Sequence, residues 1–190
     1  MEKEKKVSTP IFISHSEKDS LLVDALVKLM VLGASVNKAE IFCTSLEGMD
    51  IPKGEDFSDF IKKNLQQPKL VIILLTPNYY ESIFCLCELG ASWVLSHDMF
   101  PILVPPLDYD DVKAVLEGVG VAKVNDESDM NELKDEVDDA LQRKSPTAMW
   151  AKALKEFLGI LPSIIIKLPK PNKIGLYQYT KLKEQLKNND

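Results

Sequence analysis

Residues 70–75 form an uninterrupted apolar run, Leu-Val-Ile-Ile-Leu-Leu. A strand with one solvent-exposed face alternates apolar and polar side chains, whereas a strand covered on both faces is apolar throughout. Strands of the second kind lie inside parallel sheets, because the crossover helices pack against both faces. The run therefore predicts an α/β fold in which this segment is the central strand of a parallel sheet.

Weaker strand and helix signals alternate on both sides of the central run. Further strands are expected at residues 11–14, 41–43, 102–104 and 121–124, and helices at 16–33, 55–67, after residue 77 and at 128–143. This order predicts a flavodoxin-like open parallel five-stranded sheet with helices on both faces. Ligands of such folds bind at the carboxyl ends of the strands. Residues 14–16, the loop after Cys43 and the start of the helix containing Glu88 belong to that edge.

Two of the helix starts carry capping signals. Ser16 and Asp19 are spaced as a variant of the capping box, in which two side chains satisfy free backbone N–H groups. Asn78 and Glu81 have the same spacing after the central strand, and Ser82 is an alternative cap there.

The length and composition fit one compact domain with an extension. The chain has 190 residues, of which 45% are hydrophobic, and we place the domain at residues 7–143. Residues 144–190 are interpreted as a mostly helical C-terminal appendage. It comprises a helical stretch at 147–158, a proline-punctuated run at 162–171 and a lysine-rich amphipathic end.

The charge balance and the absence of several motifs exclude some classes of function. Acidic residues outnumber basic ones by 29 to 23, which disfavours nucleic acid as the main ligand. No run approaches the roughly 18 apolar residues of a spanning helix and no signal peptide opens the chain, so we expect a cytoplasmic protein with no membrane partner. Three cysteines, two of them in C-x-C spacing, and two histidines predict reduced thiols and no metal site. Phosphate-binding glycine loops and a G-x-S-x-G elbow are also missing.

Glu88 is the only charged residue between positions 82 and 93. An ionised carboxylate in a buried helix costs several kcal/mol unless it is paired, so it is either paired or retained for chemistry. Phe84 and Ser92 lie one helical turn to either side, which places an aromatic ring beside the carboxylate. A glutamate at the solvent edge of a mostly buried helix is the ordinary alternative.

Two other segments are candidates for ligand contact. His15 and Ser16 follow the first strand, where the first turn of an open sheet meets its ligand; alternatively, Ser16 only caps the helix and His15 is solvated. The loop from Ser45 to Gly54 is long for such a connection and is either a binding surface or a simple connection. It holds three apolar residues that favour the first interpretation, Leu46, Met49 and Ile51.

Three blocks of sequence resemble the Toll/interleukin-1 receptor (TIR) domain family, and they occur in the family's order. Residues 12–16 (Phe-Ile-Ser-His-Ser) resemble its first box, residues 42–54 its BB loop, and residues 82–89 its catalytic-helix motif S-x-W-C-x-x-E-L. The resemblance covers about residues 7–143. Without a spanning segment, the chain looks like a stand-alone bacterial member rather than a receptor tail.

The resemblance implies roles for individual residues. Glu88 matches the glutamate with which the enzymatic members of the family cleave NAD⁺ at the nicotinamide–ribose bond. Phe84 takes the place usually filled by tryptophan beside the substrate, a departure that affects stacking more than the reaction. By the same resemblance His15 and Ser16 approach the ligand, while Ser45 and Lys53 belong to the loop that borders the pocket.

The resemblance also implies partners. NAD⁺ enters as a substrate rather than a cofactor, and the chain is expected to self-associate through the BB-type loop, Ser45 to Gly54. An ADP-ribose-derived product would act as a signal for a separate effector protein, as in antiphage systems of the Thoeris type. The alternatives are a non-catalytic TIR interaction module and an effector that depletes NAD⁺.

Overall fold

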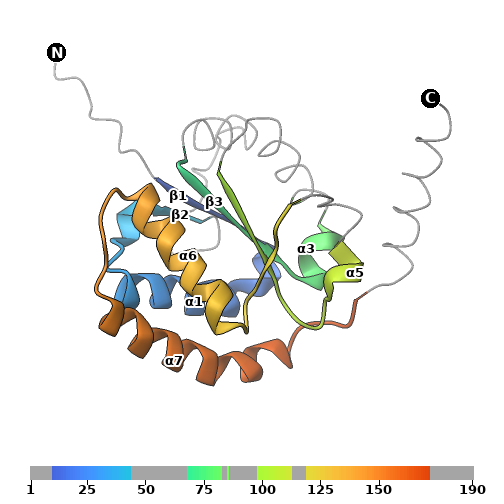
Figure 1. The fold of residues 1–190 in the computed structure, drawn as a ribbon. Helices are drawn as coiled ribbons and strands as arrows, with labels where there is room; N and C mark the ends of the chain where they lie inside the picture. Colours follow the sequence, from blue (N-terminus) through green and yellow to red (C-terminus); the bar gives the residue numbers. More distant parts are fainter. Residues whose placement is uncertain (1–9, 44–67, 83–84, 86–97, 113–118, 172–190) are drawn as a thin grey trace, which may run out of the picture.

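The computed structural model describes residues 10–43, 68–82, 85, 98–112 and 119–171, and its core is a parallel sheet of five strands (Figure 1). The strands follow the order β2-β1-β3-β4-β5 across the sheet, and every neighbouring pair is parallel. Their bounds are β1 Ile11–Ser14, β2 Ile41–Phe42, β3 Leu70–Leu75, β4 Met99–Leu103 and β5 Ala122–Lys123. The apolar run forms the central strand, so the predicted flavodoxin-like fold is confirmed.

Helices cover both faces of this sheet (Figure 1). One face carries α1 Ser20–Gly33, α6 Glu127–Ala140 and α7 Thr147–Ile165. The other carries α3 Pro77–Glu81 and α5 Tyr109–Val112. Two short 3₁₀ turns, η1 Glu17–Asp19 and η2 Lys38–Glu40, precede α1 and β2. The helix predicted at residues 55–67 lies outside the described residues.

The alternation of side chains along β3 explains why its sequence is apolar throughout. Ile72 packs into the core beneath α1, α6 and α7, whereas Val71 and Ile73 pack into the core beneath α3 and α5. Every residue of the strand is at most 1% exposed. Because each such side chain contributes about 1.5–3 kcal/mol on burial, β3 is a large part of the driving force on both faces.

The start of α1 differs from the predicted capping box. The Ser16 side chain makes no capping hydrogen bond, and α1 begins only at Ser20, after the 3₁₀ turn. Asp19 is turned into the protein, where its carboxylate accepts hydrogen bonds from Thr76 and Asn78. The Ser16–Asp19 prediction was therefore wrong, because long-range donors compete successfully for the carboxylate.

The start of α3 also differs from the first prediction. Thr76 is the N-cap, its hydroxyl accepting from the Tyr79 amide at 3.0 Å, and Pro77 occupies the first helical position. Asn78 therefore does not cap this helix. Ser82, the alternative cap, does accept a hydrogen bond, from the Cys85 amide at 3.3 Å.

Helix α7 is longer than its sequence predicts. A proline-punctuated segment was expected from Pro162, yet the helix continues through this residue to Ile165. Pro162 lacks an amide donor, but its carbonyl still accepts from Ile166 at 3.2 Å. The neighbouring Leu161 is 1% exposed in the core shared with α1. Tertiary packing thus overrides the unfavourable helix propensity of proline.

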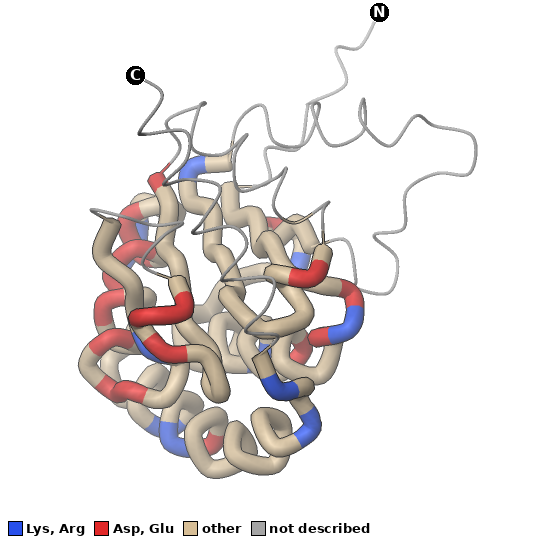
Figure 2. Tube along the Cα trace, turned by 90° about the vertical axis from the view of Figure 1, so that its right-hand side faces the viewer, with Lys and Arg blue, Asp and Glu red and all other residues tan. Residues whose placement is uncertain are grey.

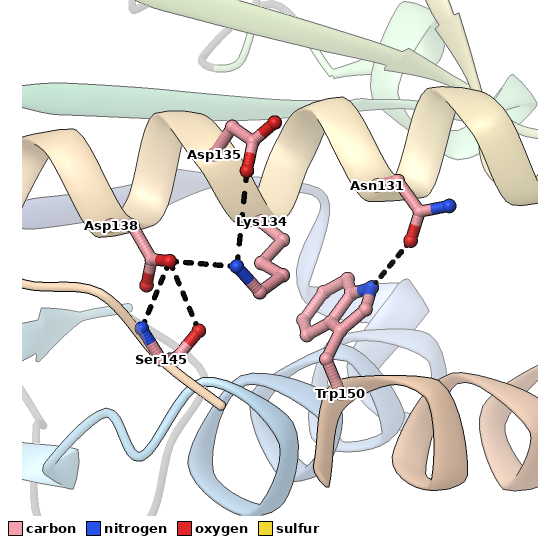
Figure 3. Close-up of polar contacts among 6 residues, drawn as sticks. All are labelled: Asn131, Lys134, Asp135, Asp138, Ser145 and Trp150. Carbon is pink, nitrogen blue, oxygen red and sulfur yellow. Dashed lines mark hydrogen bonds and ion pairs between the residues drawn. The ribbon is translucent and has the colours of Figure 1, made fainter. Parts of the chain in front are cut away.

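Polar contacts join α6 to the chain that enters α7 (Figure 3). One Asp138 oxygen accepts from Lys134 at 2.8 Å and from the Ser145 amide at 3.0 Å. Burial acts to raise the pKa of Asp138, but these hydrogen bonds outweigh it and the pKa lies below its ordinary value. The Trp150 indole N–H donates to Asn131 at 2.9 Å. Ser145 and Trp150 thereby hold the entry and the first turn of α7 against α6.

Gly33 of α1 packs directly against Trp150 of α7. A Cβ at this position would lie 2.9 Å from Trp150 Cε3 and 3.2 Å from Trp150 Cα. We expect Gly33→Ala to lower the free energy of unfolding by about 1–3 kcal/mol, because α7 would have to shift. Gly159→Ala is the matched control, since its Cβ meets nothing within 4 Å. That change should raise stability by up to about 1 kcal/mol in urea denaturation, and equal effects of the two substitutions would contradict the packing.

Charge is unevenly distributed over the described surface (Figure 2). Acidic residues follow α6, whose sequence contains seven Asp and Glu residues and one lysine. The chain segment 144–171 instead contains five lysines and one glutamate. Among the described helices, none is both long enough and apolar enough to cross a membrane.

Candidate functional site

The carboxyl ends of β1, β2 and β3 meet at one edge of the sheet, as the predicted topology requires. Polar or thiol-bearing residues end or directly follow these strands: Ser14, His15, Ser16, Cys43 and Thr76. All five are buried, with exposed fractions between 0% and 6%. Buried polar groups require hydrogen-bond partners, so the layer beneath this edge is a packed polar network.

His15 belongs to that network rather than to solvent. Its ring is 4% exposed, and Nδ1 donates to the Ile13 carbonyl at 3.1 Å. The Cys43 sulfur lies 3.5 Å from Nδ1 and 3.6 Å from Nε2. Burial lowers the pKa of His15 below its ordinary value, although the backbone hydrogen bond and nearby carboxylates oppose the shift. A neutral imidazole therefore links the turn after β1 to the end of β2, and the interpretation of His15 as solvated is wrong.

This lowered pKa predicts a pH dependence of stability. Because the folded protein binds the His15 proton less readily than the unfolded chain does, stability from this residue is present above the unfolded value of 6.5 and is lost as the pH falls below it. We expect the free energy of unfolding to decrease between about pH 7 and about pH 5.5. The decrease should be smaller in His15→Gln, measured by urea denaturation across this range. Identical slopes for the two proteins would show that another group titrates.

Asp19 ties the turn after β1 to the turn after β3. Its exposed fraction is 2%; one carboxylate oxygen accepts from the Thr76 hydroxyl, and the other accepts from the Asn78 amide at 2.6 Å. Both donors are buried as well. Hydrogen bonds to a carboxylate are stronger than neutral ones, so Asp19 holds the start of α3 against the start of α1.

Tyr79 and Cys85 continue the network beyond α3. The Tyr79 hydroxyl lies 3.0 Å from the Ser14 hydroxyl and donates to the Cys85 carbonyl at 3.0 Å. The Cys85 thiol donates to the His15 carbonyl at 3.4 Å. The main chain and the side chain of Cys85 are therefore both attached to the carboxyl end of β1.

The described residues include some of the predicted site and not the rest. His15 and Ser16 lie at the predicted edge, and their contact with substrate stays a prediction. Glu88, Phe84, Ser45 and Lys53 lie outside the described residues, as does the BB-type loop. In the described part of the chain, no group of three histidine, cysteine or acidic side chains is placed to hold a metal ion.

Sequence reasoning missed the residues that join these strands. Asp19 and Asn78 were assigned to helix caps, and Tyr79 was not singled out. A usable signal was present, because Thr76 and Asn78 directly follow a fully buried strand and need partners at its end. The sequence shows that polar residues follow the strand, but it does not show which acceptor they contact. That acceptor, Asp19, lies 57 and 59 residues away from the two donors.

A sequence model described as TIR domain matches residues 11–143, which is well over half of the chain. The chain belongs to the TIR domain family. The chain is similar to the uncharacterized protein YddK of Bacillus subtilis (strain 168), with 34% identity over 113 residues. These residues make up 60% of this chain but only 42% of YddK, so the chain spans less than half the length of that relative.

A solved TIR domain shares the fold at low sequence identity. The TIR domain of the Toll-related receptor TRR-2 from Hydra magnipapillata superposes with a TM-score of 0.53 and 20% identity, over 67% of this chain and 98% of that domain. The TIR domains of the activated Roq1 resistosome, which directly recognizes the pathogen effector XopQ, superpose less closely. Their TM-score is 0.38 at 18% identity, over 79% of this chain and 83% of that one.

Proposed function

We propose that this TIR domain cleaves NAD⁺ at the nicotinamide–ribose bond, with Glu88 as the catalytic carboxylate. Family membership supports the proposal, and the observation that carries it is the attachment of Cys85 to the end of β1. Cys85 is held there through Tyr79 and the His15 carbonyl. Glu88 follows Cys85 by three residues within the motif Ser-Ile-Phe-Cys-Leu-Cys-Glu-Leu. Cys85, within the motif that we propose to be catalytic, is thus held at the carboxyl end of β1, and ligands of such sheets bind at this edge, which supports the proposal.

The proposed chemistry requires only one carboxylate. The bond between ribose C1′ and the nicotinamide nitrogen breaks, and its electron pair neutralises the cationic ring, which leaves without protonation. The ribosyl group passes through a state with oxocarbenium character, which a nearby anion stabilises. With water as nucleophile, NAD⁺ and water give ADP-ribose, nicotinamide and a proton.

Other residues supply the surroundings of this reaction in the proposal. Phe84 packs against the substrate, Ser45 and Lys53 border it, and Ser16 approaches it from the turn after β1. His15 provides a neutral ring beside the proposed site, and its main-chain carbonyl accepts a hydrogen bond from the Cys85 thiol. A neutral histidine there adds no positive charge to a site that must accommodate a developing cation.

The product is proposed to act as a signal. We propose a cytoplasmic enzyme whose ADP-ribose-derived product, whether linear, cyclic or conjugated, is read by a separate effector in antiphage defence. Self-association through Ser45 to Gly54 would bring the domains together, so the activity should depend on protein concentration.

The test is direct incubation with NAD⁺. Purified full-length chain, over a range of concentrations and with or without lysate from phage-infected cells, is assayed for nicotinamide release by chromatography. Mass spectrometry of the adenine-containing product then separates ADP-ribose from a cyclic isomer or a conjugate. No nicotinamide above the buffer control under any of these conditions would refute the enzymatic proposal and leave an interaction module.

A further inference from the structure

The hydrogen bonds of Tyr79 have a defined direction. The Cys85 carbonyl can only accept, so the single phenol proton points toward it. The Ser14 hydroxyl, 3.0 Å away, must then donate to the phenol oxygen. The result is a chain of hydrogen bonds from Ser14 through Tyr79 to Cys85, in which each bond polarises the next.

Tyr79 is itself held firmly in place. Its side chain is 0% exposed, and its amide donates to the Thr76 hydroxyl at 3.0 Å. That hydroxyl in turn donates to the buried carboxylate of Asp19. The phenol is therefore supported from the end of β3 and from the turn before α1. Through its hydrogen bond to the Cys85 carbonyl, it fixes Cys85 relative to both.

Burial determines what this hydroxyl can do. A side chain with no exposed surface does not touch a substrate bound at the edge of the sheet. Its hydroxyl contacts the last residue of β1 and the main chain at Cys85. The hydroxyl can therefore affect a reaction through the position of the main chain at Cys85.

We infer that Tyr79 is a positioning residue for the cleavage proposed above: its hydroxyl fixes the main chain at Cys85, and it governs the rate of bond breaking rather than substrate affinity. The inference rests on the proposed function. A displacement of about 1 Å in a catalytic group can cost roughly 100-fold in rate, so a lost anchor three residues from the carboxylate has a measurable effect.

The test compares Tyr79→Phe with the wild-type full chain in steady-state NAD⁺ cleavage. Removing only the hydroxyl should lower kcat by roughly 10- to 100-fold and leave KM within about 3-fold. Ser14→Ala should lower kcat in the same direction. The double variant should be no slower than Tyr79→Phe, because both changes break one chain. Unchanged kcat, or a rise in KM alone, would overturn the inference.

Tyr109→Phe is the matched control. Its hydroxyl also donates to a main-chain carbonyl, that of Val121 at 3.2 Å, but on an exposed segment. We expect its kcat to stay within about 2-fold of wild type. A loss as large as that of Tyr79→Phe would show that the effect is general loss of structure and would overturn the inference. Assays are run well below the thermal midpoint of every variant.

Amide hydrogen exchange separates failure of this inference from failure of the proposed function. In Tyr79→Phe, exchange should accelerate in the peptide that begins at Cys85 while α1 and α6 keep their protection. This readout needs no activity. If the wild type releases no nicotinamide, the proposed function fails; unchanged exchange at Cys85 overturns the positioning role even if the enzyme is active.

Discussion

Glu88→Gln is expected to lower the rate of nicotinamide release by about 100- to 1,000-fold or more. The substitution preserves the size and the hydrogen-bonding reach of the side chain but removes its negative charge. In bound NAD⁺ the positive charge lies on the nicotinamide ring, and it develops on the ribosyl group as the bond breaks. The carboxylate beside the ribose therefore stabilises the transition state more than the bound substrate. The loss should therefore fall mainly on kcat, measured by nicotinamide release at saturating NAD⁺.

Glu81→Gln provides the control for charge removal. Glu81 lies seven residues earlier in the chain, at the end of α3, and is exposed. Its removal also changes the net charge by one unit, yet we expect kcat within about 2-fold of wild type. Equal activity of wild type and Glu88→Gln would remove Glu88 from the mechanism. Loss of activity in both variants would point to a general charge effect.

Trp150→Ala should lower the free energy of unfolding by about 3–5 kcal/mol. Trp150 is 1% exposed and packs where α7 approaches Gly33 of α1. Truncation leaves a cavity between the helices and deprives Asn131 of the indole donor at 2.9 Å. Since small domains have only about 5–15 kcal/mol of stability, this loss is a large share of the total. Urea denaturation followed by circular dichroism measures it.

Two further substitutions test whether the loss of stability comes from the burial of Trp150 or from any change in this part of α7. Met149→Ala removes the preceding side chain, which is 47% exposed, and should cost less than about 1 kcal/mol. Trp150→Phe keeps much of the packed volume but loses the indole N–H, and its cost should lie between the other two. If Trp150→Ala were as stable as Met149→Ala, α7 would not contribute to the core.

The sheet could be predicted because the patterns that specify its strands lie within short stretches of sequence. The apolar run at 70–75 required helices on both faces of the sheet. The alternation of strands and helices with short connections is compatible with only a few topologies. The short strand β5, Ala122–Lys123, and the length of α7 were less well predicted. In α7 the deciding contact is Leu161 in the core shared with α1, which a local rule about proline does not contain.

The position of the candidate site in the fold could be predicted from the sequence, but the hydrogen bonds within it could not. His15 and Ser16 lie at the predicted edge because the carboxyl ends of parallel strands meet there. The burial of His15 was not foreseen, since the sequence gives no exposed fraction for a residue just after a strand. Asp19 was assigned to a local cap, as an acid near a helix start usually is, although its partners come from the turn after β3.

By itself, the sequence determined the α/β class, the central strand, the edge at which ligands of such folds bind and the motif around Glu88, because each depends on side-chain pattern over a few neighbouring residues. Only the tertiary structure decided that Asp19 holds Thr76 and Asn78, that Tyr79 joins Ser14 to Cys85, and that α7 completes the core over α1. The physical reason is that a buried polar group must find a partner wherever the fold brings one. That choice is made in space, between segments far apart in the chain.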